Sequence, residues 1–103
     1  MTPPTRGIWV AHEVHLALLE YAWLKRTTMS DVLRAVLDHI AEVPVDESIL
    51  SVPDLPGRKR LATKTTDEQW NAAAEAAHAA GVGFHSLVRR HIIKALMEEG
   101  LLE

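Results

Sequence analysis

The stretch from Leu61 to Leu96 decides the fold, and it reads LATKTTDEQWNAAAEAAHAAGVGFHSLVRRHIIKAL. In residues 60–65, Leu61, Thr63 and Thr65 alternate with Arg60, Ala62 and Lys64. This period of two predicts a half-buried strand. The face expected to point inward carries Leu61, Thr63 and Thr65, and the outward face carries Arg60, Ala62 and Lys64.

Two helices are expected after this strand. Thr66 is followed three residues later by Gln69, a capping-box pattern, so a helix should begin near Asp67. This helix is rich in alanine and should end at Gly81, because glycine suits the left-handed turn that closes a helix. Apolar residues at helical spacing predict the second helix over residues 84–99.

The first half of the chain repeats this pattern. A shift of 55 residues without a gap places Glu13 on Glu68 and brings the apolar positions of the two halves into register. The shift predicts a strand over residues 6–10 and helices over residues 12–26 and 29–42. In the strand, the residues expected inward are Ile8 and Val10, and those expected outward are Thr5, Gly7 and Trp9.

Residues 43–57 separate the two copies. They contain three prolines and a glycine, which predicts a connector without secondary structure of its own. Its apolar residues, Ile49, Leu50, Val52 and Leu55, suggest that it packs along the surface. We therefore expect a first repeat over residues 1–42, a linker over 43–57 and a second repeat over 58–103, together forming one compact, mainly α domain.

Composition excludes several classes of protein. The 103 residues include no cysteine, so neither a disulfide framework nor a thiolate metal site can hold the fold. No apolar run approaches the ~18 residues of a membrane span, and the N-terminus has no apolar signal-peptide core. A soluble, cytoplasmic protein is expected.

The formal net charge of −3 opposes binding to nucleic acid, because phosphates are normally neutralised by Lys and Arg. Its distribution matters more. Residues 1–42 carry four basic and five acidic side chains, whereas residues 58–103 carry seven basic and six acidic ones. The basic residues of the second half gather in two places, which are Arg58, Lys59, Arg60 and Lys64, and then Arg89, Arg90 and Lys94.

A short strand, an acidic first helical turn, a helix, a polar turn and a second amphipathic helix together resemble the ribbon-helix-helix (MetJ/Arc) superfamily of prokaryotic DNA-binding proteins. The residues that carry the resemblance are Ile8 to Ile40 and Leu61 to Leu96. It implies a tandem pseudo-dimer, in which a two-stranded antiparallel ribbon packs over four helices. It further implies a sequence-specific binder of double-stranded DNA, in most cases a transcriptional repressor, whose ribbon reads the major groove.

The resemblance assigns roles to particular residues. The base-reading side chains would be Thr5, Gly7 and Trp9 from one strand and Arg60, Ala62 and Lys64 from the other. The phosphate contacts would be made by the helix starts at Thr28, Met29, Gly83 and Phe84, with Arg58 and Lys59 beside them. Family members usually carry polar or basic outward residues in the first strand, and this chain differs by its bulky Trp9.

Other functions stay open. One alternative is an accessory DNA-binding protein of plasmid mobilisation, and another is a protein-interaction or antitoxin-like module that has lost DNA binding. The sequence has no Gly-rich phosphate loop, no nucleophile elbow and no paired carboxylates that would predict an enzyme. Its six histidines show no metal-binding pattern. We therefore expect no catalytic site, no metal, no cofactor and no small-molecule substrate.

The helix predicted over residues 12–26 has an apolar stripe that the fold does not require. The stripe consists of Leu16, Leu19 and Trp23, and the equivalent positions of the second copy are Asn71, Ala74 and His78. Exposed apolar patches of this kind mark protein contacts. Either the connector covers the stripe or another chain does, and we favour self-association of chains on DNA.

Overall fold

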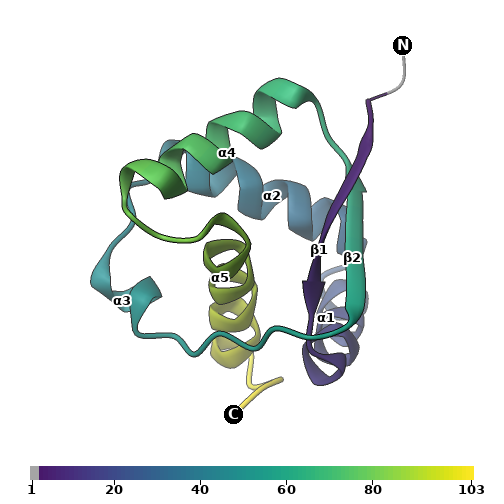
Figure 1. Ribbon diagram of the computed structural model, residues 1–103. Helices are drawn as coiled ribbons and strands as arrows, with labels where there is room; N and C mark the ends of the chain where they lie inside the picture. The colour runs from purple at the N-terminus through teal and green to yellow at the C-terminus, as the bar shows by residue number, and fades with distance from the viewer. Residues whose placement is uncertain (1–2) are drawn as a thin grey trace.

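The computed structural model describes residues 3–103, which form five helices and a two-stranded antiparallel sheet (Figure 1). The elements in order are β1 (Thr5–Val10), α1 (His12–Leu24), α2 (Met29–Glu42), α3 (Glu47–Leu50), β2 (Lys59–Lys64), α4 (Asp67–Ala79) and α5 (Phe84–Glu98). The mainly helical class is confirmed. Each strand is followed by two long helices, and the short α3 between the two copies is a fifth helix. No described helix is long and apolar enough to cross a membrane.

The two strands pair along their full length. Thr5 lies opposite Lys64 and Val10 opposite Lys59, so β1 and β2 each begin one residue earlier than predicted. The predicted inward residues of both strands, Ile8, Val10, Leu61 and Thr63, are buried. They meet buried residues of the four long helices in a single core, among them Val14, Leu33, Ala77, Leu87 and Val88.

Two helices, α2 and α4, begin where their capping residues predict. Thr66 and Gln69 form the reciprocal capping box at the start of α4, and the Thr28 hydroxyl accepts from the Asp31 amide at the start of α2. The helix predicted to reach Arg26 ends instead at Leu24. Arg26 has a left-handed backbone with φ of 55°, and a shift of 55 residues places it on Gly81, whose φ is 73°.

The turns after α1 and α4 also share their hydrogen bonds. The Thr27 amide donates to the carbonyl of Ala22, and the equivalent Val82 amide donates to the carbonyl of Ala77. Both turns therefore close their helix in the same way, one with glycine and the other with arginine in the left-handed position.

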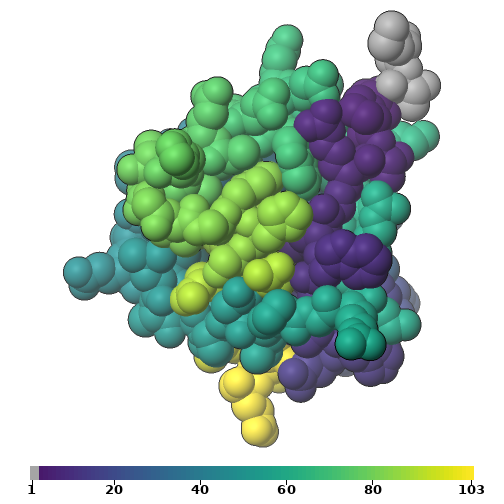
Figure 2. Space-filling model, viewed as in Figure 1, coloured from purple at the N-terminus to yellow at the C-terminus, as the bar shows by residue number. Residues whose placement is uncertain are grey.

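The connector is more ordered than predicted. Asp46 caps the single helical turn α3, and Ile49 and Val52 are buried, so the expectation of a segment without secondary structure is wrong. Arg90 on α5 holds the segment in place by donating to the carbonyls of Leu50 and Val52, at 2.7 and 2.6 Å. In Figure 2 this teal segment runs across the lower part of the visible surface.

Candidate nucleic-acid interface

The outward side chains of β1 and β2 lie on one face of the sheet. Their opposed pairs are Thr5 with Lys64, Gly7 with Ala62, and Trp9 with Arg60. Thr5, Trp9, Arg60 and Lys64 are exposed, and Trp9 keeps 51% of its surface in contact with solvent. The structure therefore brings together the six residues that the alternation pattern places outward.

Gly7 has a packing role in this face. A Cβ atom at this position would lie 2.5 Å from the carbonyl oxygen of Leu61 and 3.2 Å from the Cα of Ala62. The two backbones approach so closely that no side chain fits. Gly7 and the small Ala62 therefore leave a shallow centre between the long side chains at the two ends of the ribbon.

The exposed cations of the ribbon differ from most others in the chain. Five Lys or Arg residues form ion pairs within residues 3–103, namely Arg6 with Asp67, Lys25 with Glu99, Arg34 with Asp31, Arg89 with Asp54 and Lys94 with Glu98. Arg90 donates to backbone carbonyls. Among the described residues, those without such partners are Arg26, Arg58, Lys59, Arg60 and Lys64. Positive charge that no carboxylate neutralises is thus concentrated on and beside β2, despite the net charge of −3.

The N-terminus of α2 lies beside β2. The hydroxyls of Ser30 and Thr63 are 2.5 Å apart, which ties the first turn of the helix to the strand. Thr28 and Met29 are therefore close to the ribbon. The first turn also carries Asp31, whose carboxylate is paired with Arg34, and this acid makes the helix start less favourable for a phosphate.

Trp70 of α4 links β1 to the N-terminus of α5. The guanidinium of Arg6 on β1 is 5.7 Å from the ring centroid of Trp70, and the Trp70 ring meets the Phe84 ring edge to face at 4.8 Å. Gly83 precedes the helix without a side-chain cap, and its first turn carries no acid. The amides at Gly83 and Phe84 are therefore the better anion site of the two helix starts.

Arg89 joins the connector to the ribbon, a contact that sequence reasoning missed. Its guanidinium binds Asp54 through two hydrogen bonds, at 2.6 and 3.0 Å, and donates to the Trp9 carbonyl at 3.2 Å. The bonds from Arg89 hold the pKa of Asp54 below its ordinary value. The shift of 55 residues places Arg89 on Arg34. Because both copies have arginine at this position, the repeat did not indicate a special role for Arg89.

The apolar stripe on α1 is exposed. Leu16 and Leu19 each keep 52% of their surface exposed, and Trp23 keeps 78%. The connector therefore does not cover the stripe, because α3 packs against α5. Leu19 and Trp23 border a groove of about 340 Å³ that also touches Thr28 and Met29, so the stripe adjoins the start of α2.

Residues 3–103 contain no cluster of three or more His, Asp or Glu side chains placed to hold a metal ion. Comparisons with protein-family models, with curated proteins and with solved structures find no match to this chain.

Proposed function

We propose that this chain is a tandem ribbon-helix-helix protein that binds double-stranded DNA sequence-specifically and acts as a transcriptional repressor. The ribbon of β1 and β2 enters the major groove, which admits a two-stranded ribbon, and its outward side chains contact base edges. One polypeptide supplies both halves of the pseudo-dimer.

The packing supports the pseudo-dimer. The start of α2, from the first repeat, contacts β2 of the second, and α5, from the second repeat, contacts β1 of the first through Arg89 and the Trp9 carbonyl. Each repeat thus covers the strand of the other. The matching turns at Arg26 and Gly81 add a local sign of the same two-fold relation.

The observation that carries the proposal is the cluster of cations without acidic partners on the outward side of β2. Arg60 and Lys64 have long donor side chains, and Arg can contact the N7 and O6 atoms of guanine with two hydrogen bonds. Arg58 and Lys59 are exposed beside them and supply phosphate contacts that carry no sequence information. The helix starts at Thr28 and Met29 and at Gly83 and Phe84 add backbone amides on either side.

Self-association on DNA is the second part of the proposal. The stripe of Leu16, Leu19 and Trp23 is a contiguous apolar surface next to a helix start that would contact phosphate. Chains bound at neighbouring sites would bury it. The same exposed stripe favours the alternative of a protein-interaction or antitoxin-like module that no longer binds DNA.

The test is selection of binding sites from random duplexes, followed by mobility-shift titration at about 100 mM salt, since salt governs these affinities. One family of enriched sequences is expected. Replacing Arg60 and Lys64 together by Gln should weaken binding to the selected site by at least about tenfold. Lys94→Gln is the control, because Lys94 lies in the last part of α5, away from the helix starts and the ribbon, and its contact with Glu98 is long, at 3.9 Å.

Failure to enrich any duplex would refute the proposal and favour the protein-interaction alternative. If a sequence is enriched, the place where it occurs in the DNA of the host distinguishes repression from plasmid mobilisation. A promoter supports the repressor, and a transfer origin supports the mobilisation accessory protein.

A further inference from the structure

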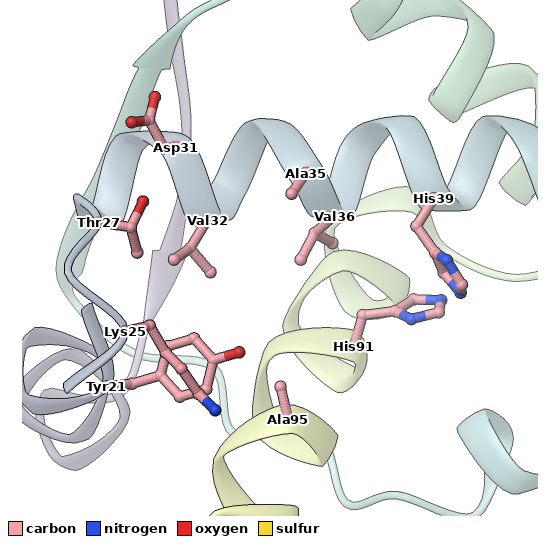
Figure 3. A pocket seen from close by; sticks show the side chains of 10 residues that line it. All are labelled: Tyr21, Lys25, Thr27, Asp31, Val32, Ala35, Val36, His39, His91 and Ala95. Carbon is pink, nitrogen blue, oxygen red and sulfur yellow. The ribbon is translucent and has the colours of Figure 1, made fainter.

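A groove of about 560 Å³ lies between α1, α2 and α5 (Figure 3). This volume is within the range of small-molecule sites. The DNA-binding proposal makes no use of the groove. Its middle is apolar, because Val32, Ala35 and Val36 of α2 line one side and Ala95 of α5 lies across from them.

A pair of histidines closes one end of the groove. The ring centroids of His39 and His91 are 5.2 Å apart, and the rings are inclined by 73°. Burial, with the nearby charges of His39 and Lys94, lowers the pKa of His91 to about 4, against the opposing effect of Asp46. His91 is therefore neutral at pH 7, and a neutral imidazole offers one donor, one acceptor and an aromatic face.

Tyr21 of α1 and Lys25, the residue that follows α1, line the other end. The Lys25 ammonium is 2.7 Å from a Glu99 carboxylate oxygen and 5.8 Å from the centroid of the Tyr21 ring. Both members of the ion pair are well exposed, so the pair contributes little and another carboxylate can replace Glu99. The acid at this end, Asp31, is already paired with Arg34.

We propose that this groove binds a small planar aromatic monocarboxylate. The aromatic ring lies against Val32, Val36 and Ala95, between the phenol of Tyr21 and the imidazole of His91. The carboxylate takes the place of Glu99 on Lys25. Lys25 is the one cation that lines the groove, and once it is released from Glu99 it suits one negative charge, whereas a phosphate or a dicarboxylate would leave charge without a partner.

The test is a titration of the full chain with 2-naphthoate, followed by amide chemical shifts in the absence of DNA. Omitting DNA makes the outcome independent of the DNA-binding proposal. Shifts are expected around residues 32–39 and 91–95. The neutral probe 2-naphthamide should bind about fivefold more weakly, since it lacks the charge that Lys25 contacts.

Two variants separate a ligand contact from a structural ion pair. Lys25→Gln should weaken naphthoate binding about fivefold, whereas Glu99→Gln should strengthen it, because the ammonium is then released for the ligand. A purely structural role of the ion pair would change binding in the same direction in both variants, and that result would overturn the proposal.

A variant at Ala35 tests the same site if Lys25→Gln fails to fold. Ala35 is exposed and lines the groove, so Ala35→Glu should weaken naphthoate binding while Ala35→Gln does so less. Equal binding of naphthoate and naphthamide would overturn the carboxylate class. Shifts confined to Leu16, Leu19 and Trp23 would show that the probe binds the exposed stripe instead and would overturn the site.

Discussion

Arg60 lies directly opposite Trp9 across the two strands, on the face that points away from the helices. Lys59, the residue before Arg60, alternates to the other face of the strand and lies across from the buried Val10. Two neighbouring cations of one strand thus have different directions, and we expect them to contribute differently to DNA binding.

The first prediction compares these two cations. Arg60→Gln should lose about 1–3 kcal/mol of discrimination at particular base pairs, because a base-edge contact is removed. Lys59→Gln should weaken all duplexes alike and reduce the slope of log affinity against log salt by about 1, as expected for one phosphate contact. Titrations of the selected site and its single-base variants at three salt concentrations measure both. Equal behaviour of the two variants would contradict the assigned face.

The second prediction concerns the close approach of the strands at Gly7. Gly7→Ala should destabilise the protein by about 1–3 kcal/mol, because its Cβ would meet the Leu61 carbonyl at 2.5 Å and the strands must separate. Gly83→Ala is the comparison, since its nearest neighbour would be 3.8 Å away. Urea unfolding of both variants provides the measurement. A Gly7 variant as stable as the parent would show that the ribbon has room for a side chain.

Much of the fold could be predicted from the sequence, because it depends on local rules. The period-two alternation gave the correct faces of both strands, and Thr28, Thr66 and Gly81 correctly marked helix ends. The end of α1 was misplaced because Arg26 takes a conformation that arginine rarely adopts, and no local pattern marks it.

The connector and the groove could not be predicted for a different reason. Arg89 meets Asp54 and Arg90 meets the Leu50 carbonyl only through contacts between distant segments. The histidine pair likewise joins α2 to α5, at positions that no motif links. Such tertiary contacts follow from the packing of the helices and leave no spacing pattern in the sequence.

The third prediction exchanges the left-handed residues of the two repeats. Arg26→Gly should stabilise the protein by about 0.5–1 kcal/mol, because glycine adopts a positive φ without steric cost. Gly81→Arg should destabilise it by about 1 kcal/mol, since nothing lies within 4 Å of an added Cβ and only the backbone conformation opposes the change. Thermal and urea unfolding report both. Changes of the same sign would mean that contacts other than backbone conformation dominate at these turns.

The fourth prediction concerns the exposed stripe on α1. Replacing Leu19 and Trp23 by Ser should reduce self-association, measured by sedimentation at increasing concentration and by cooperativity on DNA with two adjacent sites. Folding should be retained, because these side chains lie largely in solvent. The matched control is Ala74→Ser with His78→Ser, the equivalent positions of the second repeat. If neither oligomeric state nor cooperativity changes, the stripe has no role in contacts between chains.

The fifth prediction is a loss of stability in weak acid that depends on His91. The pKa of this imidazole is about 4 in the folded protein, against an ordinary value of 6.5. Between these pH values the unfolded chain binds the proton and the folded chain does not. The contribution of His91 to the free energy of unfolding is therefore fully present above pH 6.5 and is lost as the pH decreases towards 4. The full shift corresponds to about 3 kcal/mol, and screening of a half-exposed ring reduces it to about 1–2 kcal/mol.

His91→Gln should remove this dependence, because glutamine keeps a polar side chain that does not titrate. Urea unfolding at pH 7, 5.5 and 4.5 should then show a smaller decrease for His91→Gln than for the parent. The control is His12→Gln, which removes an exposed imidazole at the start of α1 and should leave the decrease as large as in the parent. Parallel curves for the parent and His91→Gln would show that other groups, such as the carboxylates, cause the acid sensitivity.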